Sequence, residues 1–473
     1  MFEVNSLKCV GCWGCVNFCP QGAIAQGIRT AEIFADMCND CGRCASVCPL
    51  GAISRSAKRN TGGKDTDHRL TTTNYQLPIS NTREYDVVII GGGPGGLSAA
   101  YFAARAGLSV LAIEKRNALG MPVACAEGIS AMGLARTFTP RAEWIGTTVE
   151  GAILVSPGGK HIFIDHPHAG YILNRPAMER DIAAMAANAG AEILTGAAVV
   201  RIEGKKSVEK LVVSRDGHRL DIRGKFYIGA DGIGGPSARW THPREPFGNE
   251  DFNTCAQVLL SADGIDEHIP EMHWGNNIAP GGYVWVFGKG NGLANVGLGV
   301  VPALCNGATP QQFLNKFLRR RFGQWRIIER RDGVVPAARR LRPPGRANML
   351  LVGDAARMPN AISGAGIDIA LFSGKLAAEC IVEMHRSAPK KIISQYARRW
   401  QKSMGKQLDF YFRLRKGVIR FSDNELDSIA EFLMPRLCGK VWDALDIPAI
   451  VMDIVFSQPR LLKLAGHFMP KIG

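Results

Sequence analysis

Eight cysteines fall within the first 48 residues, and they repeat one spacing twice. Each run reads C-x2-C-x2-C-x3-C-P and ends at Pro20 or Pro49. Three thiolates at this spacing can bind one face of an iron-sulfur cube, while the fourth cysteine reaches the other cluster. Zinc sites with four cysteines need neither the third close step nor the trailing proline. We therefore predict two [4Fe-4S] clusters with crossed ligands, one bound by Cys9, Cys12, Cys15 and Cys48 and the other by Cys38, Cys41, Cys44 and Cys19.

The residues that follow each cysteine run strengthen this prediction. Gly22-Ala23-Ile24 and Gly51-Ala52-Ile53 come shortly after the two Cys-Pro pairs. With these repeats, the first 55 residues or so resemble bacterial-type ferredoxin domains. The resemblance implies a relay that carries one electron at a time, and by itself it names no substrate.

A second chemical signature begins where an expected strand ends in glycines. The β-branched run at 85–90 leads into G-G-G-P-G-G and then into a helical pattern, and the next apolar strand ends at Glu114. Such glycines let the backbone approach a pyrophosphate at a helix N-terminus, and the acid can accept hydrogen bonds from a ribose. We therefore predict a dinucleotide site that includes Gly91, Gly93, Gly95, Gly96 and Glu114.

Two later segments indicate which dinucleotide is bound. Residues 227–232 and 350–356 each run from an apolar strand into an aspartate beside glycine, at Asp231 and Asp354. Together with the glycine motif they resemble the flavoprotein family typified by p-hydroxybenzoate hydroxylase. The resemblance implies FAD, with Asp354 at its ribityl and pyrophosphate region. It also implies FAD contacts from Arg175, Val199, Pro359, Gly364, Gly366 and Ile367.

Among such flavoproteins, the chain resembles the geranylgeranyl reductase family over roughly residues 85–379. The markers are residues 122–128 (PVACAEG) and residues 282–289 (GYVWVFGK), followed by an Asn-Val-Gly strand. The family has glycine and proline where this chain has Ala126 and Gly288. The resemblance also implies that Cys125, Ala126 and Gly128 lie beside the flavin.

Aromatic side chains occupy every second position of the later marker. Tyr283, Trp285 and Phe287 therefore face one side of an expected strand and form a wall suited to a flat or polyprenyl ligand. Ordinary core packing is the alternative for this pattern, and an inert small hydrophobe is the alternative for Cys125. We take Cys125, Tyr283, Trp285 and Phe287 as the catalytic candidates.

This combination of groups predicts the reduction of an isolated alkene. The reaction needs a hydride from reduced FAD and a proton, and clusters that carry single electrons at low potential can reduce the flavin in two steps. We expect a low-potential donor such as ferredoxin and a polyprenyl substrate, which is a membrane lipid, a quinone side chain or a chlorophyll tail. The alternatives are an electron-transfer flavoprotein component without alkene chemistry and an aromatic hydroxylase, whose need for oxygen suits low-potential clusters poorly.

Length and composition indicate the elements that position these groups. The 473 residues allow about three folded units, and 46% hydrophobic with 21% charged residues excludes a fibrous or mostly disordered chain. We expect an α/β fold in which a small α+β ferredoxin domain precedes a Rossmann-like FAD-binding domain with an inserted antiparallel-sheet substrate domain. The expected boundaries are 1–57 for the ferredoxin domain, 58–83 for a polar linker, 84–380 for the FAD domain, about 145–165 and 240–335 for the insertion, and 381–473 for a helical C-terminal region.

Positive charge gathers in two segments. Residues 319–346 hold ten Arg and two acids, and residues 390–420 hold ten basic residues and one acid. A solvated face is the ordinary explanation, and an anionic membrane or an acidic partner protein is the alternative. No nucleic-acid-binding signature accompanies the charge, and no stretch is apolar enough to span a membrane. We therefore expect a cytoplasmic protein in peripheral contact with the anionic inner face of a membrane.

Overall fold

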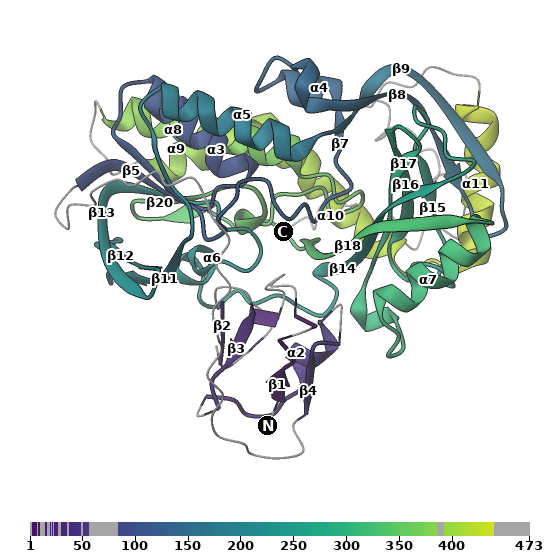
Figure 1. Ribbon diagram of the computed structural model, residues 1–473, viewed down its shortest axis with the longest axis horizontal. Helices are drawn as coiled ribbons and strands as arrows, with labels where there is room; N and C mark the ends of the chain where they lie inside the picture. Colours follow the sequence, from purple (N-terminus) through teal and green to yellow (C-terminus); the bar gives the residue numbers. More distant parts are fainter. Residues whose placement is uncertain are drawn as a thin grey trace, which may run out of the picture.

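The computed structural model has two large lobes and a small N-terminal module (Figure 1). The structure describes residues 84–385 and 392–438, and within the N-terminal module it describes 2–6, 8–9, 15–16, 19, 21, 23–26, 30–35, 37–48 and 51–55. The expected linker at 58–83 and the chain after 438 lie outside the described residues. Figure 1 shows the module, in purple, below the region where the two lobes meet.

The first lobe is built on a mainly parallel sheet. Its parallel strands lie in the order β10 (Glu192–Leu194), β6 (Val110–Ile113), β5 (Glu84–Ile90), β13 (His218–Gly229) and β20 (Met349–Leu351). Runs of Val, Ile and Leu fill β5, β6 and β20, as expected for strands that are buried on both faces. Because parallel strands end at the same edge, the motifs that follow β5, β6, β13 and β20 meet there.

Helices cover one face of this sheet. Figure 1 shows α3 (Pro94–Arg105), α5 (Arg175–Asn188) and α8 (Ile367–His385) lying side by side above it. Helix α3 begins at Pro94, directly after the glycine loop, and proline suits this position because it lacks an N–H group. At its far end the sheet continues from β13 into the antiparallel strands β12 (Lys210–Arg215) and β11 (Ala197–Glu203).

The second lobe is an eight-stranded sheet in which only β15 and β8 pair in parallel. Helix α7 (Pro310–Arg321) packs on it through Leu314, Phe317 and Leu318. The sheet takes in strands from the expected insertion and also β7 and the end of β9, which lie beyond it. In sheet order its strands are β18 (Trp325–Pro336), β14 (Phe252–Ala262), β17 (Leu293–Val300), β16 (Tyr283–Gly290), β15 (Glu271–His273), β8 (Ile145–Val155), β9 (His161–Leu173) and β7 (Gly128–Ser130).

The N-terminal module consists of two small antiparallel ribbons and a short helix. Strand β1 (Phe2–Val4) pairs with β4 (Ile53–Arg55), β2 (Ile24–Gln26) pairs with β3 (Ala31–Ile33), and α2 (Arg43–Ser46) leads toward β4. The internal repeat in the sequence thus places β2 after the first cysteine run and β4 after the second.

The chain after the first lobe is helical where it is described. Helix α9 (Ile392–Trp400), a π-helical turn (Gln401–Gly405) and α10 (Lys406–Val418) pack on the first lobe, and α11 (Asp423–Leu437) packs on β9 of the second. Among the described residues, no helix is long and apolar enough to cross a membrane.

The two basic segments are only partly exposed, which corrects the expectation of two continuous charged surfaces. Arg340 is buried and its Nε lies 3.0 Å from Oδ1 of Asp409, while Arg415 is buried and donates to Oδ1 of Asn253 at 2.7 Å. These arginines stabilise the fold through pairs between distant segments. The described basic residues that stay exposed are Arg319, Arg320, Arg326, Arg330, Arg339, Arg342, Arg346, Arg398, Lys402, Lys406, Arg413, Lys416 and Arg420.

Candidate functional site

Two cavities of similar size meet between the lobes. The nucleotide cavity, about 390 Å³, lies at the carboxyl edge of the parallel sheet, and the apolar cavity, about 370 Å³, lies against the second lobe. Ala124 and residues 331–334 of β18 line both cavities. A long ligand can therefore extend from one cavity into the other.

Most residues predicted to bind the dinucleotide line the nucleotide cavity, namely Gly91, Gly93, Glu114, Arg175, Val199, Asp231 and Asp354. Gly95 and Gly96 do not line it. A Cβ on Gly96 would lie 1.9 Å from the carbonyl oxygen of Gly91, and a Cβ on Gly95 would lie 3.2 Å from that of Ala370. These two glycines therefore allow α3 to pack closely against the loop and against α8.

Gly93 differs from its neighbours because it faces open space. A Cβ placed there would meet no protein atom within 4 Å, and Gly93 is the N-cap residue of α3. Because Gly93 lines the cavity, the N-terminus of α3 lies at the cavity wall, as helix N-termini do at sites that bind phosphate. Glu114 fixes the loop, because its Oε2 accepts from the N–H of Gly92 at 2.7 Å.

Two buried aspartates close the nucleotide cavity. Oδ2 of Asp231 accepts from the N–H of Ser237 at 2.9 Å, but its Oδ1 is buried without a hydrogen-bond partner among the described residues. Burial raises the pKa of Asp231, and it raises the pKa of Asp354 to about 6 although nearby Arg175 lowers it. Unsatisfied acceptors beside a helix N-terminus fit FAD, whose hydroxyl groups can donate and whose pyrophosphate can accept.

Residues that the resemblance places beside the flavin ring line the apolar cavity. These are Cys125, Ala126, Gly128, Gly364, Gly366 and Ile367. Pro359 does not line the cavity and lies behind it, since a Cβ on Gly366 would be 3.3 Å from its Cγ. The expected flavin ring contacts therefore gather where the two cavities join.

Tyr283, Trp285 and Phe287 line the apolar cavity from β16. The rings of Tyr283 and Trp285 meet edge to face, with their centroids 6.0 Å apart. Trp285 is only 8% exposed, and its Nε1 donates to Oε1 of Gln257 at 3.1 Å. Gly297 makes room for it, because a Cβ there would lie 2.5 Å from Cζ2 of Trp285. Core packing and cavity lining, which the sequence presents as alternatives, are thus both properties of Trp285.

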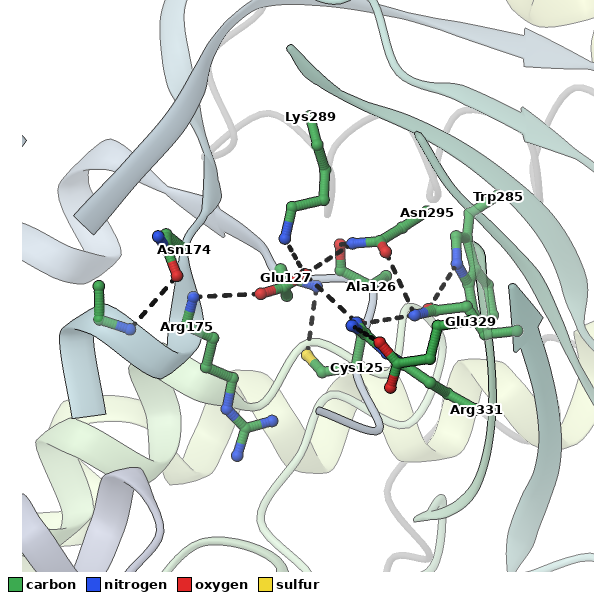
Figure 2. A network of polar contacts seen from close by, with 12 residues as sticks. Cys125, Ala126, Glu127, Asn174, Arg175, Trp285, Lys289, Asn295, Glu329 and Arg331 are labelled. Carbon is green, nitrogen blue, oxygen red and sulfur yellow. Dashed lines mark hydrogen bonds and ion pairs between the residues drawn. The ribbon is translucent and has the colours of Figure 1, made fainter. Parts of the chain in front are cut away.

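A polar network holds the loop that carries Cys125 (Figure 2). Glu127 is completely buried, and its Oε2 pairs with Nζ of Lys289 and accepts from Nδ2 of Asn295 at 2.8 Å. Its Oε1 accepts from the backbone N–H of Arg175 at 3.1 Å. Glu127 also has a positive φ of 70°, a strained conformation for this residue type. The loop is therefore fixed by an ion pair with the second lobe and by a backbone hydrogen bond from the first.

Cys125 lies at the centre of this network. Its carbonyl oxygen accepts from Nε2 of Gln257 at 3.0 Å, and its sulfur accepts from the N–H of Glu127 at 3.2 Å. Burial lowers the pKa of Arg175, but Glu179 and Cys125 raise it above its usual value overall. Cys125 thus connects the aromatic wall to the arginine of the nucleotide cavity.

The structure adds Asp332, which the sequence did not single out. Asp332 lines both cavities, and Gln311 donates a hydrogen bond from Nε2 to its Oδ1. Burial raises the pKa of Asp332 to about 6. It is therefore a carboxyl group that titrates near neutral pH at the junction of the cavities. Its strand is rich in arginine, and no sequence pattern distinguishes it from a surface acid.

The helical C-terminal region reaches one end of the apolar cavity. A small cavity of about 50 Å³ beside it is lined by Tyr283 and Ile362, which also line the apolar cavity, and by Arg415 and Ile419 of the C-terminal region. The end of α10 therefore contacts the side chains at this end of the apolar cavity.

Three described cysteines of one predicted ligand set, Cys19, Cys38 and Cys44, lie near one another. Burial raises the pKa of the Cys44 thiol to about 11, and the nearby sulfurs of Cys19 and Cys38 raise it as well. The fourth cysteine of each run is held alike, since Ala23 donates to Cys19 and Ala52 to Cys48, both at 3.2 Å. Among the described residues no three ligands converge on one point, and a cubane cluster needs no such convergence because each iron takes one thiolate. Cys12 lies outside the described residues.

Matches to known protein families and to named relatives agree with the geometry of this site. Residues 251–335 match the geranylgeranyl reductase catalytic domain, residues 84–274 match an FAD binding domain, and residues 8–52 match a 4Fe-4S dicluster domain. The digeranylgeranylglycerophospholipid reductase of Methanothrix thermoacetophila is 35% identical over 391 residues, which cover 81% of this chain and 99% of that protein. The digeranylgeranylglycerophospholipid reductase of Methanosphaerula palustris is 38% identical over 388 residues, which cover 80% of this chain and 96% of that protein. The chain belongs to the geranylgeranyl reductase family. It is an FAD-dependent reductase that acts on carbon–carbon double bonds.

A related protein with a solved structure has a similar fold. A geranylgeranyl bacteriochlorophyll reductase-like protein of Thermoplasma acidophilum superposes with a TM-score of 0.75 at 28% identity, covering 82% of this chain and 99% of that one. The flavin-dependent brominase Bmp2, at 17% identity and a TM-score of 0.59, shares the fold alone. The predicted fold class and FAD are confirmed, and the number of clusters stays a prediction. The part of this chain that the archaeal relatives leave uncovered is about as long as the segment before Glu84.

Proposed function

We propose that this reductase saturates isolated double bonds in the polyprenyl chains of a membrane lipid of the digeranylgeranylglycerophospholipid type. The observation that carries the proposal is the junction of the two cavities at residues 331–334, where an aromatic, apolar cavity opens beside the expected flavin ring contacts. The names of the archaeal relatives support the substrate class. Quinone side chains and chlorophyll tails carry the same kind of double bond and are the alternatives to test.

The residues where the two cavities join have different roles in the proposed reaction. When bound and reduced by two electrons, FAD would supply the hydride for one carbon of the double bond. We assign the proton for the other carbon to Asp332. Gln311 donates to Oδ1 of Asp332, so the acidic proton belongs on Oδ2, and burial raises its pKa to about 6. After each turnover the carboxylate takes a proton from solvent, while the aromatic wall of Tyr283, Trp285 and Phe287 holds the chain and excludes water.

The electrons come from a low-potential donor such as ferredoxin through two [4Fe-4S] clusters. The repeated cysteine runs and the match to a 4Fe-4S dicluster domain support this relay. Single-electron carriers suit a flavin that must collect two electrons before it reduces a substrate.

The membrane contact is made by one face of α10. Lys406, Arg413 and Lys416 are exposed and follow a spacing of seven and three residues, which places them on the same side of a helix. Arg420 continues the series just beyond the helix and is exposed as well. Each basic residue near an anionic surface contributes about 1 kcal/mol, so this face supports peripheral binding next to the C-terminal end of the apolar cavity.

An anaerobic assay tests the proposed function. The holoprotein, a reduced ferredoxin-type donor and each candidate substrate are incubated, and the products are analysed by mass spectrometry. We expect the digeranylgeranyl lipid to gain the mass of two hydrogens for each bond reduced. Oxidation of the donor without any gain in lipid mass would instead support an electron-transfer flavoprotein component.

A further inference from the structure

The N-terminal module shares one apolar core with the two lobes. Module residues Val16, Ile24 and Ile53 are at most 4% exposed. They belong to the same cluster of buried side chains as Phe252, which is 0% exposed, and Ala338, which is 5% exposed. Burial of apolar surface on both sides of a contact stabilises it, so the module is docked against the body of its own chain.

The same core reaches the wall of the nucleotide cavity. Ile233 belongs to the core, is 8% exposed and lines the nucleotide cavity. Val334 packs against the core and lines both cavities. The apolar core that the module shares with the lobes therefore extends to the wall of the cavity whose residues fit FAD.

Cys19 packs against the shared core and also lies near a charged residue of the first lobe. Burial lowers the pKa of Arg239 on α6 (Pro236–Thr241), while Asp231 and the sulfur of Cys19 raise it. Arg239 thus lies near both Cys19 in the module and Asp231 in the nucleotide cavity. Figure 1 agrees with this order, since β2, which follows Cys19, lies closer to the lobes than β1 and β4 do.

We propose that the module delivers electrons to the flavin within the same chain, across Ile233 and Val334, and that the cluster bound by Cys38, Cys41, Cys44 and Cys19 makes the delivery. The inference rests on the proposed relay. An external donor of the ferredoxin class is oxidised by one electron at the other cluster, which passes it to the delivering cluster and then to the flavin. Two such transfers, with protons taken from solvent, complete the two-electron reduction that one hydride requires.

Arg239 has a positioning role in this scheme. Its positive charge stabilises the reduced, more negative state of the nearby cluster and so raises the reduction potential of that cluster relative to its neighbour. This favours electron flow from the outer cluster to the delivering cluster. The arginine acts on the cluster through space and takes no part in binding the lipid.

The first experiment measures whether delivery is internal. Holoprotein is mixed rapidly with reduced donor in excess, and loss of flavin absorbance is followed at several protein concentrations. We expect a final step whose rate is independent of protein concentration. A rate that rises in proportion to protein concentration would overturn delivery within one chain, and this measurement needs no variant.

The second experiment disrupts the apolar contact between the N-terminal module and the lobes. Ala338→Glu introduces a charge into the shared core without altering a cavity wall, and Ile328→Glu is the matched control on β18, where the side chain is 49% exposed. We expect Ala338→Glu to keep its iron and FAD and to slow flavin reduction by roughly tenfold or more, with the control unchanged. Reduction at the normal rate in Ala338→Glu would contradict the proposed path.

The third experiment identifies the delivering cluster through its potential. Redox titration of Arg239→Gln, followed by EPR, should lower the potential of one cluster only. That cluster should be the one whose signal disappears in Cys19→Ser and persists in Cys48→Ser, a matched change in the other run. A shift in the other cluster, in both equally or in neither would overturn the assignment. None of these readouts depends on lipid reduction, so they separate this inference from the proposed substrate.

Discussion

The two cavities between the lobes differ in almost everything except their size. The nucleotide cavity is formed by backbone turns, a helix N-terminus and buried carboxylates, which together suit one ligand with fixed polar groups. The apolar cavity is lined by β16 aromatic side chains and small residues, and a polar network that includes Glu127 and Gln257 of the lining holds them in place. The difference indicates that the cofactor is bound through hydrogen bonds and charge, whereas the substrate is bound through shape and apolar burial.

The largest effect is expected at the glycine loop, where two neighbouring glycines have different roles. Gly96→Ala should abolish FAD binding and lower the folded yield, because its Cβ would lie 1.9 Å from a backbone oxygen. Gly93→Ala should fold normally, since its Cβ meets no protein atom, but should weaken FAD by roughly tenfold, about 1.4 kcal/mol. Thermal melting and flavin absorbance measure the two quantities. Equal effects of the two changes would contradict the distinct roles.

The aromatic wall gives the next largest effect. Trp285→Ala removes a buried ring and should cost about 3–5 kcal/mol of stability while lowering lipid turnover, with FAD content unchanged. Trp285→Phe keeps a ring but loses the bond to Gln257, and should cost about 1 kcal/mol. Denaturant unfolding and turnover are measured on both variants. A Trp285→Ala variant with normal turnover would show that the wall belongs to the core alone.

Asp332, which lies where the two cavities join, should make the stability of the protein depend on pH. Its pKa is raised in the folded protein to about 6 from 3.8, so its stabilising contribution is present below about pH 4 and is lost as the pH rises through 6. Asp332→Asn should therefore be more stable than the parent at pH 8, by about 1–3 kcal/mol, and the gain should vanish near pH 4.

The same variant tests proton donation. Turnover of the parent should fall as the pH rises above 6, and Asp332→Asn should lose most turnover while dithionite still reduces its flavin at the normal rate. An unchanged pH profile of turnover in Asp332→Asn would remove Asp332 from the reaction.

The smallest effect is expected on the membrane face of α10. Lys406→Glu combined with Arg413→Glu and Lys416→Glu should abolish sedimentation with anionic liposomes at low salt, and high salt should release the parent because the charges are screened. The matched control reverses three exposed basic residues at strands β11, β12 and β13 of the first lobe, with Lys205→Glu, Lys206→Glu and Arg219→Glu. Equal loss of binding in the control would mean that net charge, rather than this face, is responsible.

How far the sequence predicts the molecule depends on the kind of residue. Motifs that fix backbone geometry, such as the glycine loop and the segments around Asp231 and Asp354, were located because few residue types can perform their task. Trp285 could be placed on one face of a strand but not assigned to cavity or core, since burial depends on what packs opposite.

Other features were beyond the reach of local patterns. Asp332 and Gln257 become functional candidates only when β14 and β18 are paired beside the loop of Cys125, a contact between segments about 130 and 200 residues apart. The buried arginines of the basic segments were misjudged as exposed for the same reason, because their partners, such as Asp409 for Arg340, come from distant helices. Charge counted along a sequence does not reveal which charges are paired in space.

A single-turnover experiment tests the central claim most directly. The holoprotein is reduced under anaerobic conditions, freed of donor and mixed with one equivalent of digeranylgeranyl lipid, and flavin absorbance and lipid mass are followed together. We expect reoxidation of each flavin to accompany the gain of one pair of hydrogens by one lipid double bond. Flavin that stays reduced in the presence of the lipid, or that is reoxidised without any gain in lipid mass, would contradict it.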